Sequence, residues 1–155
     1  MEITRGTLDA VYALIYFHRQ PAGHVADLHK LSETLDVPPS YLSKVLQQLH
    51  KSGFLISQMG SKGGYRLSKN VEKTSMREVL RAMQGDPLLQ ECLSDHFNCE
   101  RFKKCSVLKH VKEIQDMVYL MLDRLTIGQL AAEMELHERQ EKTLLIPSQV
   151  SLGVQ

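Results

Sequence analysis

Apolar residues recur at intervals of three and four in the first half of the chain, and this spacing predicts a series of short helices. The first covers residues 7–17 and ends at a Pro-Ala-Gly segment that cannot continue a helix. The second follows Asp27, whose side chain suits an N-cap, and stops at two adjacent prolines. The third runs from residue 41 to about residue 52, with Ser40 as its predicted N-cap. We therefore expect three helices that share one small core.

A short β-hairpin is predicted directly after the third helix. Gly53 stands where a glycine ends a helix, residues 54–56 begin a strand, and residues 65–67 form the return strand beyond a glycine-rich turn. Ser75 then caps a fourth, shorter helix. Helix, turn, helix and hairpin in this order predict a mainly α fold, with a winged helix-turn-helix domain over residues 1–85.

The polar face of the third helix is the predicted DNA-reading surface. One α-helix fits the major groove of double-stranded DNA, where Gln, Lys and Ser side chains can bond base edges or phosphates. This face carries Ser40, Tyr41, Ser43, Lys44, Gln47, Gln48 and Lys51. Lys62 lies at the hairpin tip, where glycines let the backbone approach a phosphate or the minor groove. The alternative is an ordinary solvated helix face, but the ordered combination of elements favours DNA binding.

A long helix with a repeating apolar pattern is predicted in the second half, from about residue 106 to residue 125. Its apolar residues, in alternating steps of four and three, are Val107, Val111, Ile114, Val118, Met121 and Leu125. Such a heptad pattern favours pairing of two helices, so we expect a homodimer whose symmetry matches a palindromic operator. The alternative is packing against the N-terminal domain of the same chain. A short final helix completes a dimerisation segment over residues 106–135, and a flexible tail is expected over residues 136–155.

Charge and hydropathy narrow the expected partners. Residues 1–85 contain eleven Lys and Arg against seven Asp and Glu, a net charge of +4, whereas residues 86–155 contain eight against eleven, a net charge of −3. A positive N-terminal half attracts phosphate backbones. No apolar run reaches the roughly 20 residues that span a bilayer, and the N-terminus lacks the pattern of a signal peptide. We therefore expect a cytoplasmic protein with no membrane partner.

The cysteines form a second candidate site. Cys92, Cys99 and Cys105 are the only cysteines of the chain, and they fall in a predicted cluster-binding loop over residues 86–105, of which residues 88–105 show no clean periodicity. A reducing cytosol disfavours disulfides, and thiolates are soft ligands for iron–sulfur clusters, zinc or copper(I). A thiolate at the N-terminal end of the long helix, at Cys105, would also be favoured by the helix dipole. Three unrelated buried thiols are the alternative, but clustering in a polar segment favours a shared metal or cluster.

Three motifs resemble those of the IscR/NsrR-type (Rrf-family) bacterial regulators. They are Pro-Ser-Tyr-Leu-Ser-Lys-Val-Leu-Gln-Gln-Leu at residues 39–49, Lys-Ser-Gly-Phe-Leu at residues 51–55, and Gly-Gly-Tyr-Arg-Leu at residues 63–67. The resemblance covers about residues 1–135 and implies a winged-helix dimer. The DNA contacts that it implies are Ser40, Tyr41 and Lys44. Family members often place an arginine just before the first wing glycine, whereas this chain has Met59, so Lys62 is the nearest basic substitute.

The resemblance also implies that the three cysteines hold an iron–sulfur cluster, either 2Fe–2S or 4Fe–4S. The fourth ligand does not carry over. IscR-type members use a histidine three residues after the third cysteine, where this chain has Leu108, and NsrR-type members use an aspartate from the partner's first helix, where this chain has Leu8. Asp9, His96 and His110 are the remaining candidates. A zinc site of three cysteines and one histidine is the chemical alternative.

The expected function is that of a homodimeric transcriptional regulator, with repression as the default, that senses iron–sulfur, redox or nitric oxide status through the cluster. The alternative is a winged-helix regulator without a cluster, controlled by structural zinc, a small molecule or a partner. The chain contains no Walker glycine loop, no Gly-x-Ser-x-Gly elbow and no His-Glu-x-x-His pair, so no enzymatic activity is expected.

Overall fold

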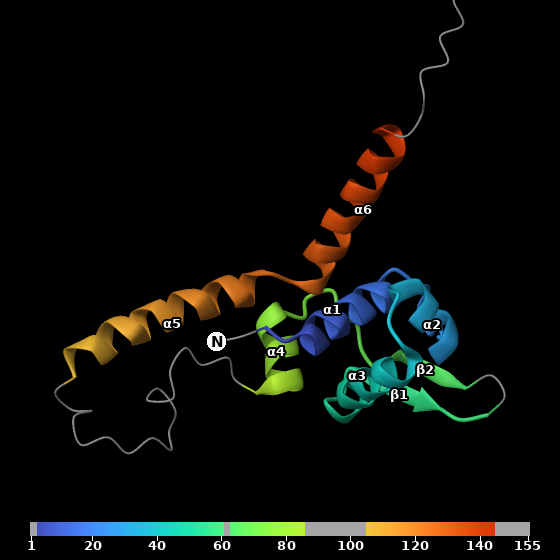
Figure 1. The fold of residues 1–155 in the computed structure, drawn as a ribbon, viewed down its shortest axis with the longest axis horizontal. Coiled ribbons are helices and arrows are strands. Elements are labelled where there is room, and N and C mark those ends of the chain that lie inside the picture. Colours follow the sequence, from blue (N-terminus) through green and yellow to red (C-terminus); the bar gives the residue numbers. More distant parts are fainter. Residues whose placement is uncertain (1–2, 61–62, 86–104, 145–155) are drawn as a thin grey trace, which may run out of the picture.

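The computed structural model describes residues 3–60, 63–85 and 105–144, and it forms a winged-helix body from which a long helix projects (Figure 1). The elements are α1 (Arg5–His18), α2 (Leu28–Leu35), α3 (Pro39–Lys51), β1 (Leu55–Gln58), β2 (Gly64–Leu67), α4 (Met76–Gln84), α5 (Ser106–Arg124) and α6 (Ile127–Leu144). The predicted mainly α, winged helix-turn-helix fold is confirmed.

The core of the body forms around α1, which packs against α3, α4 and α6. Apolar side chains from the first four helices and β1 meet there. The fully buried ones include Leu14, Leu31, Leu42, Leu46, Leu49, Leu55 and Leu80. Burying one such side chain stabilises the fold by roughly 1.5–3 kcal/mol. The predicted shared core of the first three helices is therefore present.

The helix caps follow the predictions at two positions and depart from them at a third. The Asp27 carboxylate accepts hydrogen bonds from two backbone N–H groups of α2, and Ser75 forms a reciprocal capping box with Glu78 at the start of α4. The prediction of Ser40 as the N-cap of α3 was wrong. The helix begins two residues earlier than predicted, at Pro39, because proline has no N–H to leave unsatisfied and its φ angle already suits the first helical position.

The wing is a two-stranded antiparallel hairpin, in which Leu55 lies opposite Leu67 and Gln58 opposite Gly64. The segment before α2 adds a bridge to it, since Ala26 and Tyr65 exchange two backbone hydrogen bonds of 2.8 and 3.0 Å. A Cβ atom at Gly64 would lie 2.2 Å from the Ala26 carbonyl oxygen. Only glycine allows this approach, so the wing is fixed against the body at its base.

Backbone hydrogen bonds attach the C-terminal helices to the body at the junction between α5 and α6. The Met76 N–H donates to the Leu125 carbonyl at 2.7 Å, and the Ile127 N–H donates to the Thr74 carbonyl at 2.9 Å. From this junction α5 projects away from the body, whereas α6 starts against α1 (Figure 1). No helix of the described residues is long and apolar enough to cross a membrane.

The final helix is longer than predicted. α6 continues to Leu144, so the expectation of a short helix followed by a flexible tail from residue 136 was wrong for residues 136–144. The Arg19 guanidinium donates to both carboxylate oxygens of Glu138, at 2.8 and 2.7 Å, and it also pairs with Glu135. These contacts with α1, together with residues of high helix propensity, extend the helix past its last apolar turn. Residues 145–155 lie outside the described residues.

Candidate DNA interface and cysteine segment

The recognition helix α3 separates its apolar and polar sides as the predicted interface requires. Leu42, Val45, Leu46 and Leu49 are buried in the core. The opposite side carries the exposed residues Ser40, Lys44, Gln47 and Lys51. Two lysines and two short polar side chains on one accessible face can contact phosphates and base edges.

The N-terminal end of α3 is also suited to a phosphate. It has no side-chain cap, so its first backbone N–H groups keep the partial positive charge of the helix end. The exposed Ser40 stands in this first turn. A helix N-terminus of this kind binds anions through its backbone.

Two residues of the predicted polar face are engaged inside the protein. The Gln48 side-chain amide donates to the Ala82 carbonyl of α4 at 2.9 Å, so Gln48 joins two helices of the body. Tyr41 is half-buried, and its hydroxyl lies against α1, where a Cβ atom at Gly6 would be only 3.3 Å from it. Burial raises the pKa of Tyr41, and hydrogen bonding with Asp9 raises it further. Tyr41 is therefore a packed residue at the edge of the face.

The wing turn is exposed at its first described residues, Met59 and Gly60. Met59 is 98% exposed, and the Gly63 N–H donates to the Gly60 carbonyl at 2.9 Å to close the turn. A Cβ atom at Gly63 would lie 2.6 Å from the Gln58 carbonyl oxygen, which explains the glycine there. Lys62, the predicted basic contact of the wing, lies outside the described residues.

The outer side of α5 exposes a strip of large apolar residues. Its members are Val107, Ile114, Met117, Leu120 and Met121, of which Met121 is 72% exposed. The six residues of the predicted seam differ in exposure, since Val107, Ile114 and Met121 are exposed and the other three are not. Val111, Val118 and the C-cap residue Leu125 are half-buried, and Leu125 packs against the core of the same chain. Met117 and Leu120 are absent from the predicted seam. Met117 lies three residues after Ile114 and four before Met121, whereas Leu120 directly precedes Met121.

The candidate cysteine site is only partly described. Cys105 is exposed, stands at the N-cap of α5 and forms no side-chain cap hydrogen bond. Cys92, Cys99 and His96 lie outside the described residues. Within the described residues, no three His, Cys, Asp or Glu side chains lie close enough together to hold a metal ion.

The two other candidates for a fourth ligand differ in their surroundings. His110 is exposed on α5, and its Nδ1 atom lies 3.3 Å from a carboxylate oxygen of Glu113. Asp9 is buried in the body, with its Oδ2 atom 3.9 Å from the Arg5 Nε atom. The N-terminal end of α5 lies at the far end of the projecting helix, away from α1 (Figure 1). The fold therefore separates Asp9 from Cys105 within one chain.

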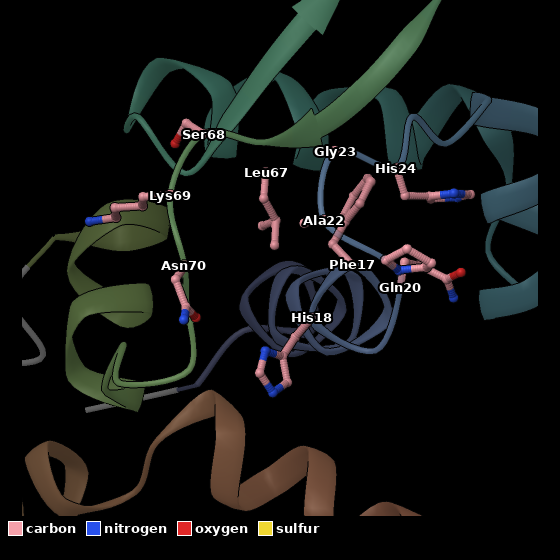
Figure 2. Close-up of a pocket in the computed structure, with 11 residues that line it drawn as sticks. Phe17, His18, Gln20, Ala22, Gly23, His24, Leu67, Ser68, Lys69 and Asn70 are labelled. Atoms are coloured by element: carbon pink, nitrogen blue, oxygen red, sulfur yellow. The ribbon is translucent and has the colours of Figure 1, made fainter.

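A hollow of about 390 Å³ lies between the end of α1 and the segment after β2. Figure 2 shows that His24 and Lys69 extend away from its centre on opposite sides. The Ser68 hydroxyl donates to the Gly53 carbonyl, and the Asn70 side chain accepts from the Glu72 N–H at 2.8 Å. Ser68 and Asn70 at its edge are thus used by the fold, and His24 and Lys69 do not converge on the hollow.

Comparison with known proteins decides the family. The model of the Rrf2 family, described as an iron-dependent transcriptional regulator, matches residues 3–133. The chain belongs to the Rrf2 family. The predicted resemblance to these regulators is confirmed, and the chain is an Rrf2-type winged-helix transcriptional regulator with a DNA-binding fold.

Individual relatives agree with this assignment. The HTH-type transcriptional regulator NsrR of Bacillus subtilis is 27% identical over 136 residues, which are 87% of this chain and 93% of NsrR. The structure of CymR, the global cysteine regulator of B. subtilis, superposes with a TM-score of 0.67 at 22% identity and covers 86% of this chain and 98% of CymR. IscR of T. potens superposes with a TM-score of 0.58 at 20% identity and covers 86% of this chain and 88% of IscR. NsrR and CymR are both named as regulators.

The Rrf2 family model is described as that of an iron-dependent regulator, and the thiols of this chain can be compared with the ligands that iron–sulfur clusters use. The three thiols of the chain are the ligand type that such clusters use. The one described thiol, that of Cys105, is accessible and stands at a helix N-terminus, where a thiolate is stabilised. The cysteine thiols of this chain are therefore of the ligand type that an iron–sulfur cluster requires.

Proposed function

We propose that this Rrf2 regulator is a homodimer that binds a palindromic operator as a repressor, and that a cysteine-bound iron–sulfur cluster controls the binding. The observation that carries the proposal is the exposed apolar strip on α5, which projects from a body that presents a polar recognition helix. Among the described residues of one chain nothing covers this strip, and large exposed apolar patches are typical of interfaces.

Two-fold pairing through α5 would cover the apolar strip and place the two recognition helices for DNA binding. Heptad spacing at Ile114, Met117 and Met121 allows side chains of two helices to interdigitate. Two copies of α3, related by the same axis, would then face successive major grooves of a palindromic site. The contacts with DNA would come from Ser40, Lys44, Gln47 and Lys51, with Lys62 from the wing.

The sensing part of the proposal depends on the position of the cysteines. Cys92, Cys99 and Cys105 lie in the sequence between α4 of the body and α5 of the proposed interface. The chain's own contribution would be three thiolates, one of them at the helix N-terminus of α5. When bound, the cluster would supply a group that oxidants or nitric oxide can alter. A change of ligation there would alter how α5 is held, and hence the spacing of the two recognition helices.

The experiment has two measurements on one anaerobic preparation. Iron, sulfide and zinc are counted per chain beside the visible absorption spectrum, and an operator is selected by the protein from a random-sequence duplex library. We expect matching iron and sulfide, absorption between about 320 and 460 nm, and a palindromic selected sequence. A variant with Cys92, Cys99 and Cys105 all changed to Ala should lose the visible absorption, and its operator binding should no longer change when oxidant is added. An unchanged oxidant response in that variant would refute the sensing part and leave the operator binding intact.

A cluster-free regulator is the second candidate, and specific residues favour it. Leu108 and Leu8 occupy the two positions where relatives supply a fourth ligand, and Asp9 is buried against the recognition helix. A colourless protein with zinc would favour a structural metal, and one without metal after reconstitution would favour control by a small molecule or partner. Either result would leave the DNA-binding function unchanged.

A further inference from the structure

A corner of the reading surface, where α1 meets the start of α3, contains a buried acid that the proposed function does not use. Asp9 is only 8% exposed, and its Oδ2 atom is buried without a hydrogen-bond partner among the described residues. Unsatisfied buried carboxylate oxygens are costly and uncommon in native proteins. The nearest cation is Arg5, one helical turn earlier, whose Nε atom lies 3.9 Å from Oδ2. This arrangement indicates that the Asp9 carboxylate interacts with the side chains where α1 meets the start of α3.

Tyr41 of the recognition helix reaches the same corner. Its hydroxyl lies so near α1 that a Cβ atom at Gly6 would be 3.3 Å away, closer than most side-chain neighbours. Its environment raises the pKa of the hydroxyl, first through burial and then through the hydrogen bond and negative charge of Asp9. A hydroxyl that lies against α1 and is influenced by Asp9 is poorly placed to contact a DNA phosphate. Tyr41 therefore anchors the first turn of α3 to α1.

Arg5 is the outward-facing member of the corner. Its side chain is 80% exposed, and it acts electrostatically on the Tyr41 hydroxyl, whose pKa it lowers. Since Tyr41 belongs to the first turn of α3, this interaction places the Arg5 cation near the start of the recognition helix. A guanidinium fits a phosphate through two parallel hydrogen bonds.

We propose that Arg5 is a DNA-backbone contact supplied by α1, and that Asp9 is a positioning residue that orients Arg5 and Tyr41 at the edge of the reading surface. This adds a contact outside α3 and the wing, and it gives Asp9 a role other than cluster ligation. The inference rests on the proposed operator binding but not on the cluster.

The first test measures affinity for the operator duplex selected by the wild-type protein, as a function of salt. Arg5→Gln should weaken binding on the order of tenfold and lower the slope of log K against log salt by about two per dimer, one for each protomer. Arg5→Lys should keep the slope. The matched control is Lys73→Gln, which removes an exposed cation from the loop beside α6 and should change affinity less than about twofold. An Arg5→Gln protein that behaves like the Lys73→Gln control would overturn the proposal.

The second test is a double-mutant cycle between Asp9 and Tyr41. Asp9→Asn and Tyr41→Phe should each weaken operator binding several-fold. The double variant should bind no more weakly than the weaker of the two single variants, because both changes break the same contact between Asp9 and Tyr41. Losses that multiply would overturn the positioning role. So would a visible spectrum altered by Asp9→Asn and not by Tyr41→Phe, since that result would make Asp9 a cluster ligand. A wild-type protein that enriches no duplex would instead refute operator binding itself.

Discussion

The winged-helix body and the α5 helix differ in how far they bury their large apolar side chains. In the body, α3 buries every member of its apolar stripe, and Asp27 and Ser75 cap the starts of two neighbouring helices. In α5, by contrast, Ile114 and Met121 are exposed, and the buried residue of the helix is a glutamine, Gln115. The body thus buries its apolar stripes among its own helices, whereas α5 presents an apolar surface that no other described residue covers.

This difference separates stability from assembly. A change inside the body should alter the free energy of unfolding of each chain, and a change on the outer side of α5 should alter association. The same kind of substitution is therefore expected to have different readouts in the two regions.

The largest expected effect is on the body. Leu46 is fully buried, so Leu46→Ala should lower the free energy of unfolding by about 3 kcal/mol, through lost burial and the cavity that remains. Urea unfolding followed by circular dichroism measures this. Met59→Ala, at a position that is 98% exposed, is the control and should change stability by less than about 0.5 kcal/mol. Equal effects of the two changes would contradict the described core.

The next effect is on association through α5. Ile114→Glu would place a charge in the apolar strip of both copies, and it should raise the dimer dissociation constant at least about 100-fold. Sedimentation velocity across a concentration series measures it. Lys112→Glu also changes charge on α5, but outside the strip, and it should leave association nearly unchanged. Association that survives Ile114→Glu would show that another surface forms the dimer.

A smaller effect is expected at the start of α4, next to the junction with α5. Ser75→Ala removes the side chain that accepts from the Glu78 N–H, and it should cost about 1 kcal/mol of stability. Ser57→Ala, at an exposed strand position, is the matched control. The thermal unfolding midpoint of the two variants gives the comparison, and no difference between them would mean that the capping box contributes nothing.

The smallest effect is expected where α6 meets α1. Arg19→Gln breaks the paired hydrogen bonds with Glu138, but surface ion pairs contribute only up to about 1 kcal/mol. Global stability should therefore change little, while amide hydrogen exchange in α6 becomes faster than in α1. High salt should reduce the difference between wild type and variant, because it screens the pair. Unchanged exchange in α6 would mean that its apolar residues alone hold the helix.

Sequence patterns predicted the body better than the site because local interactions determine its elements. The periodicity of residues 7–17 and 41–52, the glycine turn and the cap at Ser75 are all visible in short windows. The error at Ser40 was local as well, because a proline at the first helical position competed with a serine cap. Helix α6 was underestimated because its ion pairs with Arg19 join residues more than a hundred positions apart.

The site required contacts that no short window contains. Gln48 has the chemistry of a base-reading residue, and only the position of Ala82 on another helix shows that its amide is engaged. Tyr41 and Asp9 lie 32 positions apart in the sequence and meet through the packing of α1 on α3. Cys92, Cys99 and Lys62 stay predictions, because they lie outside the described residues.

The central claim is that two copies of α5 cover each other's apolar strip, and the molar mass of the wild-type protein tests it most directly. Light scattering on an anaerobic sample at micromolar concentration should give twice the 17.7 kDa mass of one chain. The Ile114→Glu variant under the same conditions should give the mass of one chain. A wild-type mass of 17.7 kDa would contradict the account.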